Sequence, residues 1–132
     1  MEKLLSVILV GKILLENFIK MINRYMEMAA NYARTIDDGR NFRLAALAIR
    51  TDGVIVKSTN LSTQLPQPRG HAEARVMLKA GWGSTVYVAR VMKNGELALS
   101  KPCANCERMM RARGVKKVYY SISQNEYGCL IF

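Results

Sequence analysis

Two short segments, far apart in the chain, restrict what it can fold into more than any other feature. The first is His71-Ala72-Glu73, and the second is Pro102-Cys103-Ala104-Asn105-Cys106. Together they hold one imidazole, two thiols and a carboxylate. Zinc takes imidazole and thiolate ligands, and a catalytic zinc site uses three of them and leaves the fourth position to water. The two segments therefore predict a metal site that activates water, which favours an enzyme over a structural module.

The size and composition of the chain predict one domain that needs no disulfides. It has 132 residues, half of them apolar, which is enough for a buried core. Its three cysteines are an odd number and two of them form a Cys-x-x-Cys pair, which is typical of metal or redox use in a reducing compartment. We therefore expect a cytoplasmic protein. The net charge of +10 favours anionic partners, such as nucleotides or single-stranded nucleic acid.

The first twenty residues differ from the rest in pattern. An apolar run from Leu4 to Val10 follows Lys3, but no small-residue cleavage site of a secretory signal comes after it. The run is also far shorter than the roughly 20 apolar residues that span a bilayer. We expect no membrane partner, a helical or poorly ordered extension over 1–20, and a single domain over 21–132. The apolar extension and the Leu- and Met-rich first helix offer surface for self-association.

Hydrophobic periodicity predicts a mixed α/β order of elements. Apolar residues at helical spacing predict a helix over 14–36 with one buried stripe. The patterns that follow predict strands at 42–50 and 54–57, a helix at 71–80, a strand at 85–91 that returns through 97–99, a helix at 102–113, and strands at 115–122 and 127–132. This order predicts helices packed on a central sheet. The last two strands are too close for a crossover and should form a hairpin.

The spacing of the polar residues indicates that they have different chemical roles. Cys103 and Cys106 are three apart at a helix start, so they face the same way and can hold one ion. His71 begins another helix and can supply the third ligand. Glu73 lies two residues further on, which points it roughly 200° away around a regular helix. That direction is poor for a second ligand and better suited to moving protons at the edge of the site.

Two other interpretations of the cysteines remain open at this point. Cys129 could complete a closed structural zinc site, although its apolar strand favours packing as a small hydrophobe. The Cys-x-x-Cys pair could instead be a redox pair, although Pro102 precedes it and the chain's one histidine lies upstream.

The order His-Ala-Glu, then Pro-Cys-x-x-Cys after a strand, resembles the cytidine deaminase-like superfamily, and the resemblance runs from about residue 22 to the end. It implies a three-layer α/β/α fold with a mixed five-stranded sheet and a C-terminal β-hairpin. It also implies Zn²⁺ as cofactor and Glu73 as the catalytic proton carrier. The ligands would be His71, Cys103 and Cys106, and the substrate contacts would be Asn60, the N–H of Ala72 and the backbone near Pro102.

The resemblance implies hydrolytic deamination of a cytosine nucleoside or nucleotide, with release of ammonia, by a homo-oligomer such as a dimer or tetramer. The basic charge favours an alternative, an editing deaminase acting on cytidine or adenosine in single-stranded DNA or tRNA. A second alternative is a non-catalytic, zinc-stabilised nucleic-acid-binding protein. A hairpin inserted over 91–100 departs from many members. The direct C-terminal hairpin resembles free cytidine deaminases and toxin-like or phage deaminases, whereas His-Ala-Glu is commoner in deoxycytidylate and tRNA-adenosine deaminases.

Overall fold

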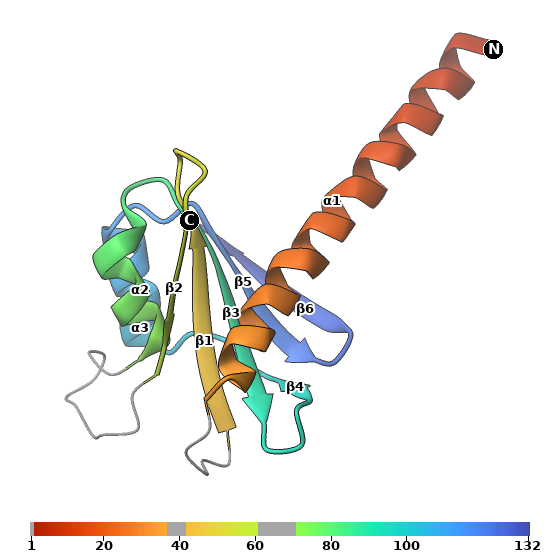
Figure 1. Cartoon of the computed structure of the whole chain (residues 1–132). Coiled ribbons are helices and arrows are strands. Elements are labelled where there is room, and N and C mark those ends of the chain that lie inside the picture. Colours follow the sequence, from red (N-terminus) through yellow and green to blue (C-terminus); the bar gives the residue numbers. More distant parts are fainter. Residues whose placement is uncertain (1, 37–41, 61–70) are drawn as a thin grey trace.

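The computed structural model describes residues 2–36, 42–60 and 71–132, with side chains from residue 9 onward. In this part of the chain three helices surround a mixed sheet (Figure 1). The elements, in order, are α1 (Glu2–Arg34), β1 (Phe42–Ile49), β2 (Ile55–Thr59), α2 (Ala72–Ala80), β3 (Thr85–Met92), β4 (Leu97–Ala98), α3 (Ala104–Ala112), β5 (Lys117–Ser123) and β6 (Glu126–Ile131).

The sheet has the order β2-β1-β3-β5-β6, and only the β3–β5 pair among the described strands is parallel. The predicted mixed sheet and its C-terminal hairpin are therefore confirmed. A sixth strand, β4, adds to the five that the sequence predicts. It forms because β5 pairs only with Thr85 to Val88 of β3, which leaves Arg90 and Val91 free to pair with Ala98 and Leu97.

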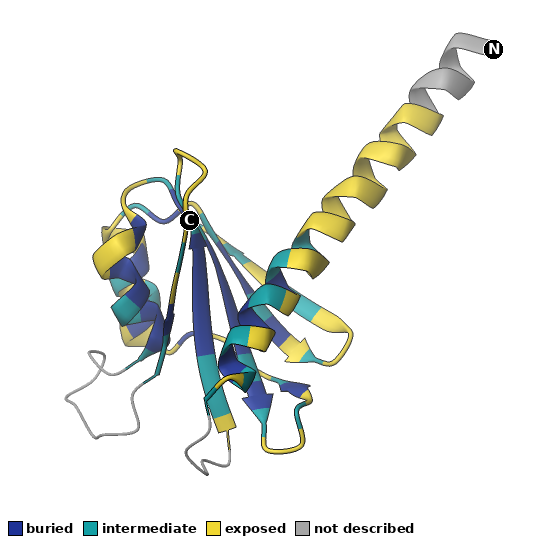
Figure 2. Ribbon diagram, in the orientation of Figure 1, coloured by how far each residue is buried: buried dark blue, intermediate teal, exposed yellow. Residues whose placement is uncertain are grey.

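Small apolar residues on both faces of the central strands create the three layers. In β1, Ala45 and Leu47 face α1, whereas Ala46 and Ala48 face α2 and α3. Because both faces are covered, the middle parts of the central strands β1 and β3 are buried (Figure 2). The helices pack on the sheet through Met26, Ala29, Ala30 and Ala33 of α1, Ala72, Val76 and Ala80 of α2, and Cys106 and Met110 of α3.

Helix α1 is longer than the predicted 14–36 and begins at Glu2. Its C-terminal half packs on the sheet, whereas residues 9–21 are exposed (Figure 2). Gly11 costs about 1 kcal/mol of helix propensity and does not end the helix. In the described part of the chain, no helix is both long enough and apolar enough to cross a membrane.

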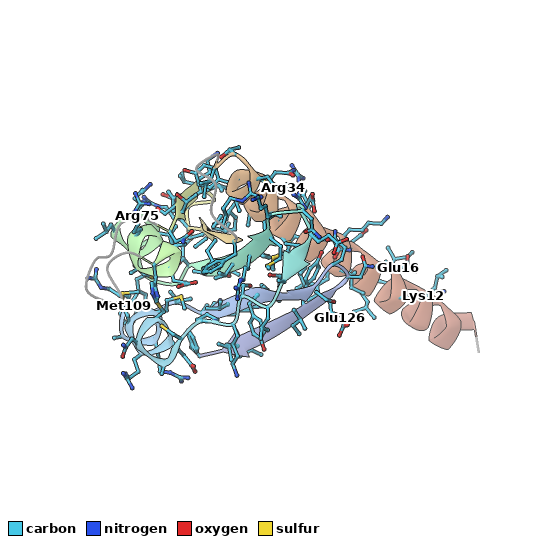
Figure 3. The ribbon with its side chains drawn as sticks, turned by 90° about the horizontal axis from the view of Figure 1, so that it is seen from below. Lys12, Glu16, Arg34, Arg75, Met109 and Glu126 are labelled. Atoms are coloured by element: carbon cyan, nitrogen blue, oxygen red, sulfur yellow. The ribbon has the colours of Figure 1, made fainter. Side chains whose placement is uncertain are left out.

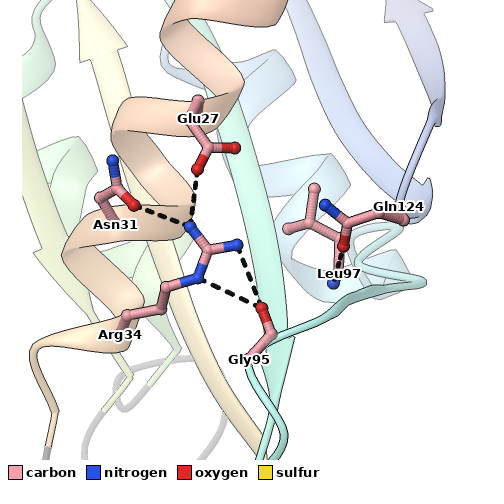
Figure 4. A network of polar contacts seen from close by, with 6 residues as sticks. All are labelled: Glu27, Asn31, Arg34, Gly95, Leu97 and Gln124. Carbon is pink, nitrogen blue, oxygen red and sulfur yellow. Dashed lines mark hydrogen bonds and ion pairs between the residues drawn. The ribbon is translucent and has the colours of Figure 1, made fainter.

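The inserted β3–β4 hairpin is fixed from two sides (Figure 4). The Nε and Nη2 of Arg34, at the end of α1, donate to the Gly95 carbonyl at 3.2 and 3.0 Å. Glu27 orients the same guanidinium through an ion pair of 2.7 Å. From the β5–β6 turn, the Gln124 side chain accepts a hydrogen bond of 3.0 Å from the Leu97 N–H. The hairpin is therefore a fixed part of the domain.

Two buried serines join β4, β3 and β5 directly before the cysteine segment. The Ser100 hydroxyl donates to the Val88 carbonyl at 2.8 Å and accepts from the Ser121 N–H at 2.8 Å. The Ser121 hydroxyl donates to the Ala98 carbonyl at 2.6 Å and accepts from the Arg90 N–H at 3.2 Å. These bonds satisfy backbone groups where β4 leaves the sheet, and they fix the start of the turn that leads to Cys103.

We expect Ser121→Ala to lower the free energy of unfolding by about 2 kcal/mol, because it removes the part-buried hydrogen bonds to the Arg90 N–H and the Ala98 carbonyl. Ser123→Ala is the matched control, since the hydrogen bond of the Ser123 hydroxyl within the described residues is an exposed one to the Glu126 carboxylate, and its cost should stay within about 0.5 kcal/mol. Chemical denaturation of both variants measures the difference. Equal costs would show that the two serines do not hold this junction.

Candidate active site

The two motif segments meet because α2 and α3 pack on the same face of the sheet with their N-termini together. His71 is the N-cap of α2, with extended φ and ψ of −77° and 146°. Cys103 is the N-cap of α3, and its sulfur accepts from the Cys106 N–H at 3.4 Å. Helix α3 therefore begins at Ala104 and not at Pro102 as the sequence predicted, because the Cys103 side chain takes the capping position.

The three predicted ligands lie around one point. His71 Nδ1 is 3.3 Å from Cys106 Sγ and 3.7 Å from Cys103 Sγ. The ligand atoms of His71, Cys103 and Cys106 all lie within 4.8 Å of one another. In a tetrahedral zinc site the bond lengths place a thiolate sulfur and an imidazole nitrogen about 3.6 Å apart. The observed separations fit this value, and two thiolates with one imidazole are the donors that zinc prefers.

Cys129 lies on the other side of the sheet from these ligands. It pairs with Tyr119, which belongs to the core under α1, and it lines a hollow beside Ile19 and Ile22. The group of metal-binding side chains found among the described residues does not include it. A closed site with Cys129 as fourth ligand therefore does not form, and the fourth position stays open toward the cavity.

Glu73 is buried beside the three ligands, with 4% of its surface exposed. Burial raises the pKa of its carboxyl above the usual range, while the Cys106 thiol and the His71 ring act in the opposite direction. Burial, and next the neighbouring Glu73 carboxylate, also raise the pKa of the Cys106 thiol. A bound cation offsets that cost because it stabilises the thiolate.

Glu73 and His71 line the same cavity, although the spacing argument placed them on different sides of a helix. The argument assumed that both residues are helical, but His71 has extended backbone angles and precedes the first turn. The side chains therefore converge. Among the described residues, the group of possible ligand atoms consists of His71, Cys103 and Cys106 and does not include Glu73, whose role as a proton carrier stays a prediction.

The cavity has a volume of about 150 Å³ and is open to solvent. Its walls combine the metal segments with the turn before α3 and with β1 and β3, through Leu44, Arg90, Leu99, Ser100, Lys101 and Pro102. An engineered cavity of similar volume holds one benzene molecule. The cavity can therefore hold a single six-membered ring next to the metal ligands.

The three predicted substrate contacts have different surroundings. Pro102 is buried in the cavity wall. Ala72 is buried at the first position of α2, where helix N–H groups have no partner within the helix. Asn60 follows β2, and its Oδ1 accepts from the Leu44 N–H at 2.8 Å while its own N–H donates to the Leu44 carbonyl at 3.0 Å. Asn60 thus has a structural role at the end of the sheet, and its contact with a sugar stays a prediction.

Sequence reasoning missed Leu44 and Arg90 as cavity residues. Arg90 carried a usable signal, because it interrupts the apolar residues of β3 on the face of Val86 and Val88. The role of Ser100 had no local signal, since its partners come from β3 and β5.

A mixed sheet between helices, with an imidazole and two thiols at the starts of two of those helices, defines a zinc-binding α/β domain. The model of the cytidine and deoxycytidylate deaminase zinc-binding region matches residues 19–122, which is most of the chain. The chain therefore belongs to this family, as its motifs predicted. Zinc is the family's metal, and His71, Cys103 and Cys106 are positioned to bind it.

Solved structures of cytidine deaminases share the fold. The enzyme from Burkholderia pseudomallei matches with a TM-score of 0.61 and 18% identity over 80% of this chain and 88% of that one. The Mycobacterium leprae enzyme gives a TM-score of 0.53 and 16% identity over 79% and 88%. The Mycobacterium tuberculosis enzyme gives a TM-score of 0.51 and 18% identity over 75% of this chain and 85% of that one. A comparison with curated protein sequences gave no match.

We expect the purified protein to contain about one zinc ion per chain and Cys103→Ser to lose it, because a hydroxyl is a much poorer zinc ligand than a thiolate. Serine is a good N-cap, so this variant keeps the start of α3. Cys129→Ser, the control, should retain the metal. Elemental analysis after dialysis measures the zinc content, and loss of zinc from Cys129→Ser would contradict the assigned ligands.

Proposed function

We propose that the protein is a zinc-dependent hydrolytic deaminase that converts a cytosine nucleoside or nucleotide to the uracil form and releases ammonia. The observation that carries this proposal is the burial of Glu73 beside three ligand side chains in a cavity sized for one ring. A purely structural zinc site does not need a buried carboxylate, and burying an unpaired carboxylate lowers the stability of the fold. This disfavours the non-catalytic, zinc-stabilised nucleic-acid-binding protein.

The chain's own residues have distinct tasks in this reaction. His71, Cys103 and Cys106 hold the zinc, which when bound supplies a Lewis acid that makes water nucleophilic near neutral pH. Glu73 accepts the proton of that water and delivers protons to the base ring and to the departing amine. The Ala72 N–H, at the positive end of α2, holds the carbonyl of the base. The backbone of the turn ending at Pro102 accepts hydrogen bonds from the amino group.

The net charge of +10 supports one competing function, an editing deaminase that acts on single-stranded DNA or tRNA. A cytosine mononucleotide is favoured because several basic side chains are engaged within the domain. Arg75 donates to the Thr59 carbonyl, Lys79 donates to the Lys57 carbonyl, and Arg111 pairs with Glu107. Strongly salt-dependent binding of oligonucleotides, with no deamination of free nucleosides or nucleotides, would favour the editing enzyme.

We expect Glu73→Gln to lower kcat by about 10²- to 10⁴-fold, because general acid–base catalysis contributes that much and an amide cannot exchange the protons. The variant should keep the zinc content of the unchanged protein, since Glu73 is not a ligand. An assay of ammonia release over cytidine, deoxycytidine and their monophosphates measures the rate. Unchanged activity on these substrates would remove Glu73 from the mechanism, and activity on purines alone would contradict the proposed base.

We also propose that the protein is a cytoplasmic homo-oligomer in which the extension over residues 1–20 of one copy packs against the extension of a second copy, outside the single domain over 21–132. Eight large apolar side chains between Leu9 and Met21 are about half exposed. Three of them, Leu15, Phe18 and Ile19, lie on the side of the helix that continues the stripe packed on the sheet, and a second helix can cover them together. The free cysteines suit a reducing compartment.

The charges along the extension favour a second copy as its partner. Lys12 and Glu16 project from the part of α1 beyond the sheet, as Figure 3 shows. They are equally far along the helix from Leu14. An antiparallel copy that packs on the side of Leu15 and Ile19, with its midpoint level with Leu14, places each lysine near the partner's Glu16 at the rim of the contact.

We expect Leu15→Glu to shift the protein toward monomers, because it places a charge in the apolar stripe that the second copy covers. Leu15 is 58% exposed, so the variant should keep its fold. Asn17→Glu adds the same charge to the same exposed part of the helix at a polar position and should leave the assembly intact. Light scattering coupled to size-exclusion chromatography measures the mass. A monomeric unchanged protein, or equal effects of the two variants, would contradict this interface.

A further inference from the structure

Arg90 is a cation in the wall of the cavity that the proposed chemistry does not use. Val86 and Val88 of β3 point toward α2 and α3, and Arg90 is the next residue on the same face. The core ends there and the cavity begins, so Arg90 lines it together with Glu73 and His71.

The Arg90 guanidinium is held in place, but its N–H groups are unused. Its Cζ lies 4.1 Å from the centroid of the Phe42 ring, and this contact on one face leaves the edge of the group for an acceptor. The Nε is buried without a hydrogen-bond partner. Within the described part of the chain, the ion pairs and side-chain hydrogen bonds give the guanidinium no acceptor.

Arg43, on the neighbouring strand, shows what a structural arginine looks like in this fold. Its Nη1 donates to the Ile36 carbonyl at 2.9 Å, and its Nη2 donates to the Met92 carbonyl at 3.1 Å. Arg43 therefore closes the end of the sheet by satisfying backbone carbonyls. The Nε of Arg43 is buried without a partner, as that of Arg90 is, so the two arginines differ at their Nη atoms. Among the described residues, those of Arg90 have no acceptor, and a charged donor shielded from water lowers stability unless a ligand completes it.

Arg90 lies where the phosphate of a nucleotide would be if its base ring were bound beside Glu73. Leu44 of β1 pairs with Arg90 on one side and exchanges backbone hydrogen bonds with Asn60 on the other. Because neighbouring strands lie about 4.8 Å apart, Asn60 and Arg90 are separated by about 10 Å across this edge of the sheet. The cavity holds one ring beside Glu73, so the rest of a nucleotide extends along the edge. Lys101, also in the cavity wall, adds positive charge there.

We propose that Arg90 binds the phosphate of a pyrimidine mononucleotide, so that the site selects a nucleoside monophosphate over the free nucleoside. This inference rests on the proposed deaminase function and specifies its substrate class. Guanidinium groups bind phosphate oxygens through paired N–H donors, which is the contact that the free edge of Arg90 offers. Phe42 is a positioning residue, because its ring fixes the plane of the guanidinium.

The test compares kcat/KM for deoxycytidine monophosphate and deoxycytidine in the unchanged protein, Arg90→Gln and Arg90→Lys. The unchanged protein should prefer the monophosphate by at least about 10-fold. Arg90→Gln should lower kcat/KM for the monophosphate by about 10- to 100-fold and for the nucleoside far less. Arg90→Lys should recover part of the loss. Lys93→Gln, which removes one positive charge from the exposed β3–β4 turn, should leave the preference unchanged.

The inference is overturned if the unchanged protein prefers the nucleoside, or if Arg90→Gln lowers both values equally, as a merely structural residue would. A larger effect of Arg90→Gln on a single-cytosine oligonucleotide than on the monophosphate would also overturn it, in favour of nucleic acid.

A calorimetric titration of Glu73→Gln with the same two compounds separates this inference from the proposed function. The monophosphate should bind more tightly than the nucleoside, and adding Arg90→Gln should remove the difference. Equal binding by Glu73→Gln overturns the role of Arg90 even if deamination is observed. Tighter binding that depends on Arg90, without turnover by the unchanged protein, supports the phosphate site and contradicts the proposed reaction.

Discussion

The packing of α2 and α3 against one face of β1 and β3 is the constraint on which the site depends. The residues beneath the helices are small or β-branched, such as Ala46 and Val88, so both helices lie close to the sheet. Cys106 belongs to this core and is also a metal ligand. Core and metal centre are therefore one cooperative unit, and metal binding contributes to the stability of the fold.

Local sequence signals predicted the elements and the ligands well, because the chemistry is concentrated at helix starts. Periodicity identified the helices and strands, and the motif spacing identified the three side chains that meet. The exact positions of the helix starts were not predictable from spacing, because they depend on caps. Cys103 takes the capping position, so α3 begins at Ala104 and not at Pro102, and the extended backbone of His71 lets His71 and Glu73 line one cavity.

Features that depend on several strands left little trace in the sequence. Ser100 and Ser121 look like ordinary strand and loop residues until β3, β4 and β5 come together and leave backbone groups to satisfy. Arg43 and Arg90 illustrate the same limit, because both are arginines near strand ends of one sheet. The sequence shows neither that carbonyls bind the Nη atoms of the first nor that the second lines the cavity.

Helix α1 shows how one continuous pattern takes on two physical roles. From Ile22 onward its apolar stripe lies on the sheet and forms half of the core, where Ala29 and Ala33 are buried together with the larger Met26. Before Ile22 the helix leaves the sheet: the Phe18 ring still contacts Lys117 of β5, whereas Leu14 and Leu15 are more than half exposed. Large apolar side chains on the surface of a helix are what contact with a second helix uses, because they interdigitate. Their continuation beyond the sheet argues that the exposed half of α1 is built for a helical partner and is not an accidental extension of the core helix.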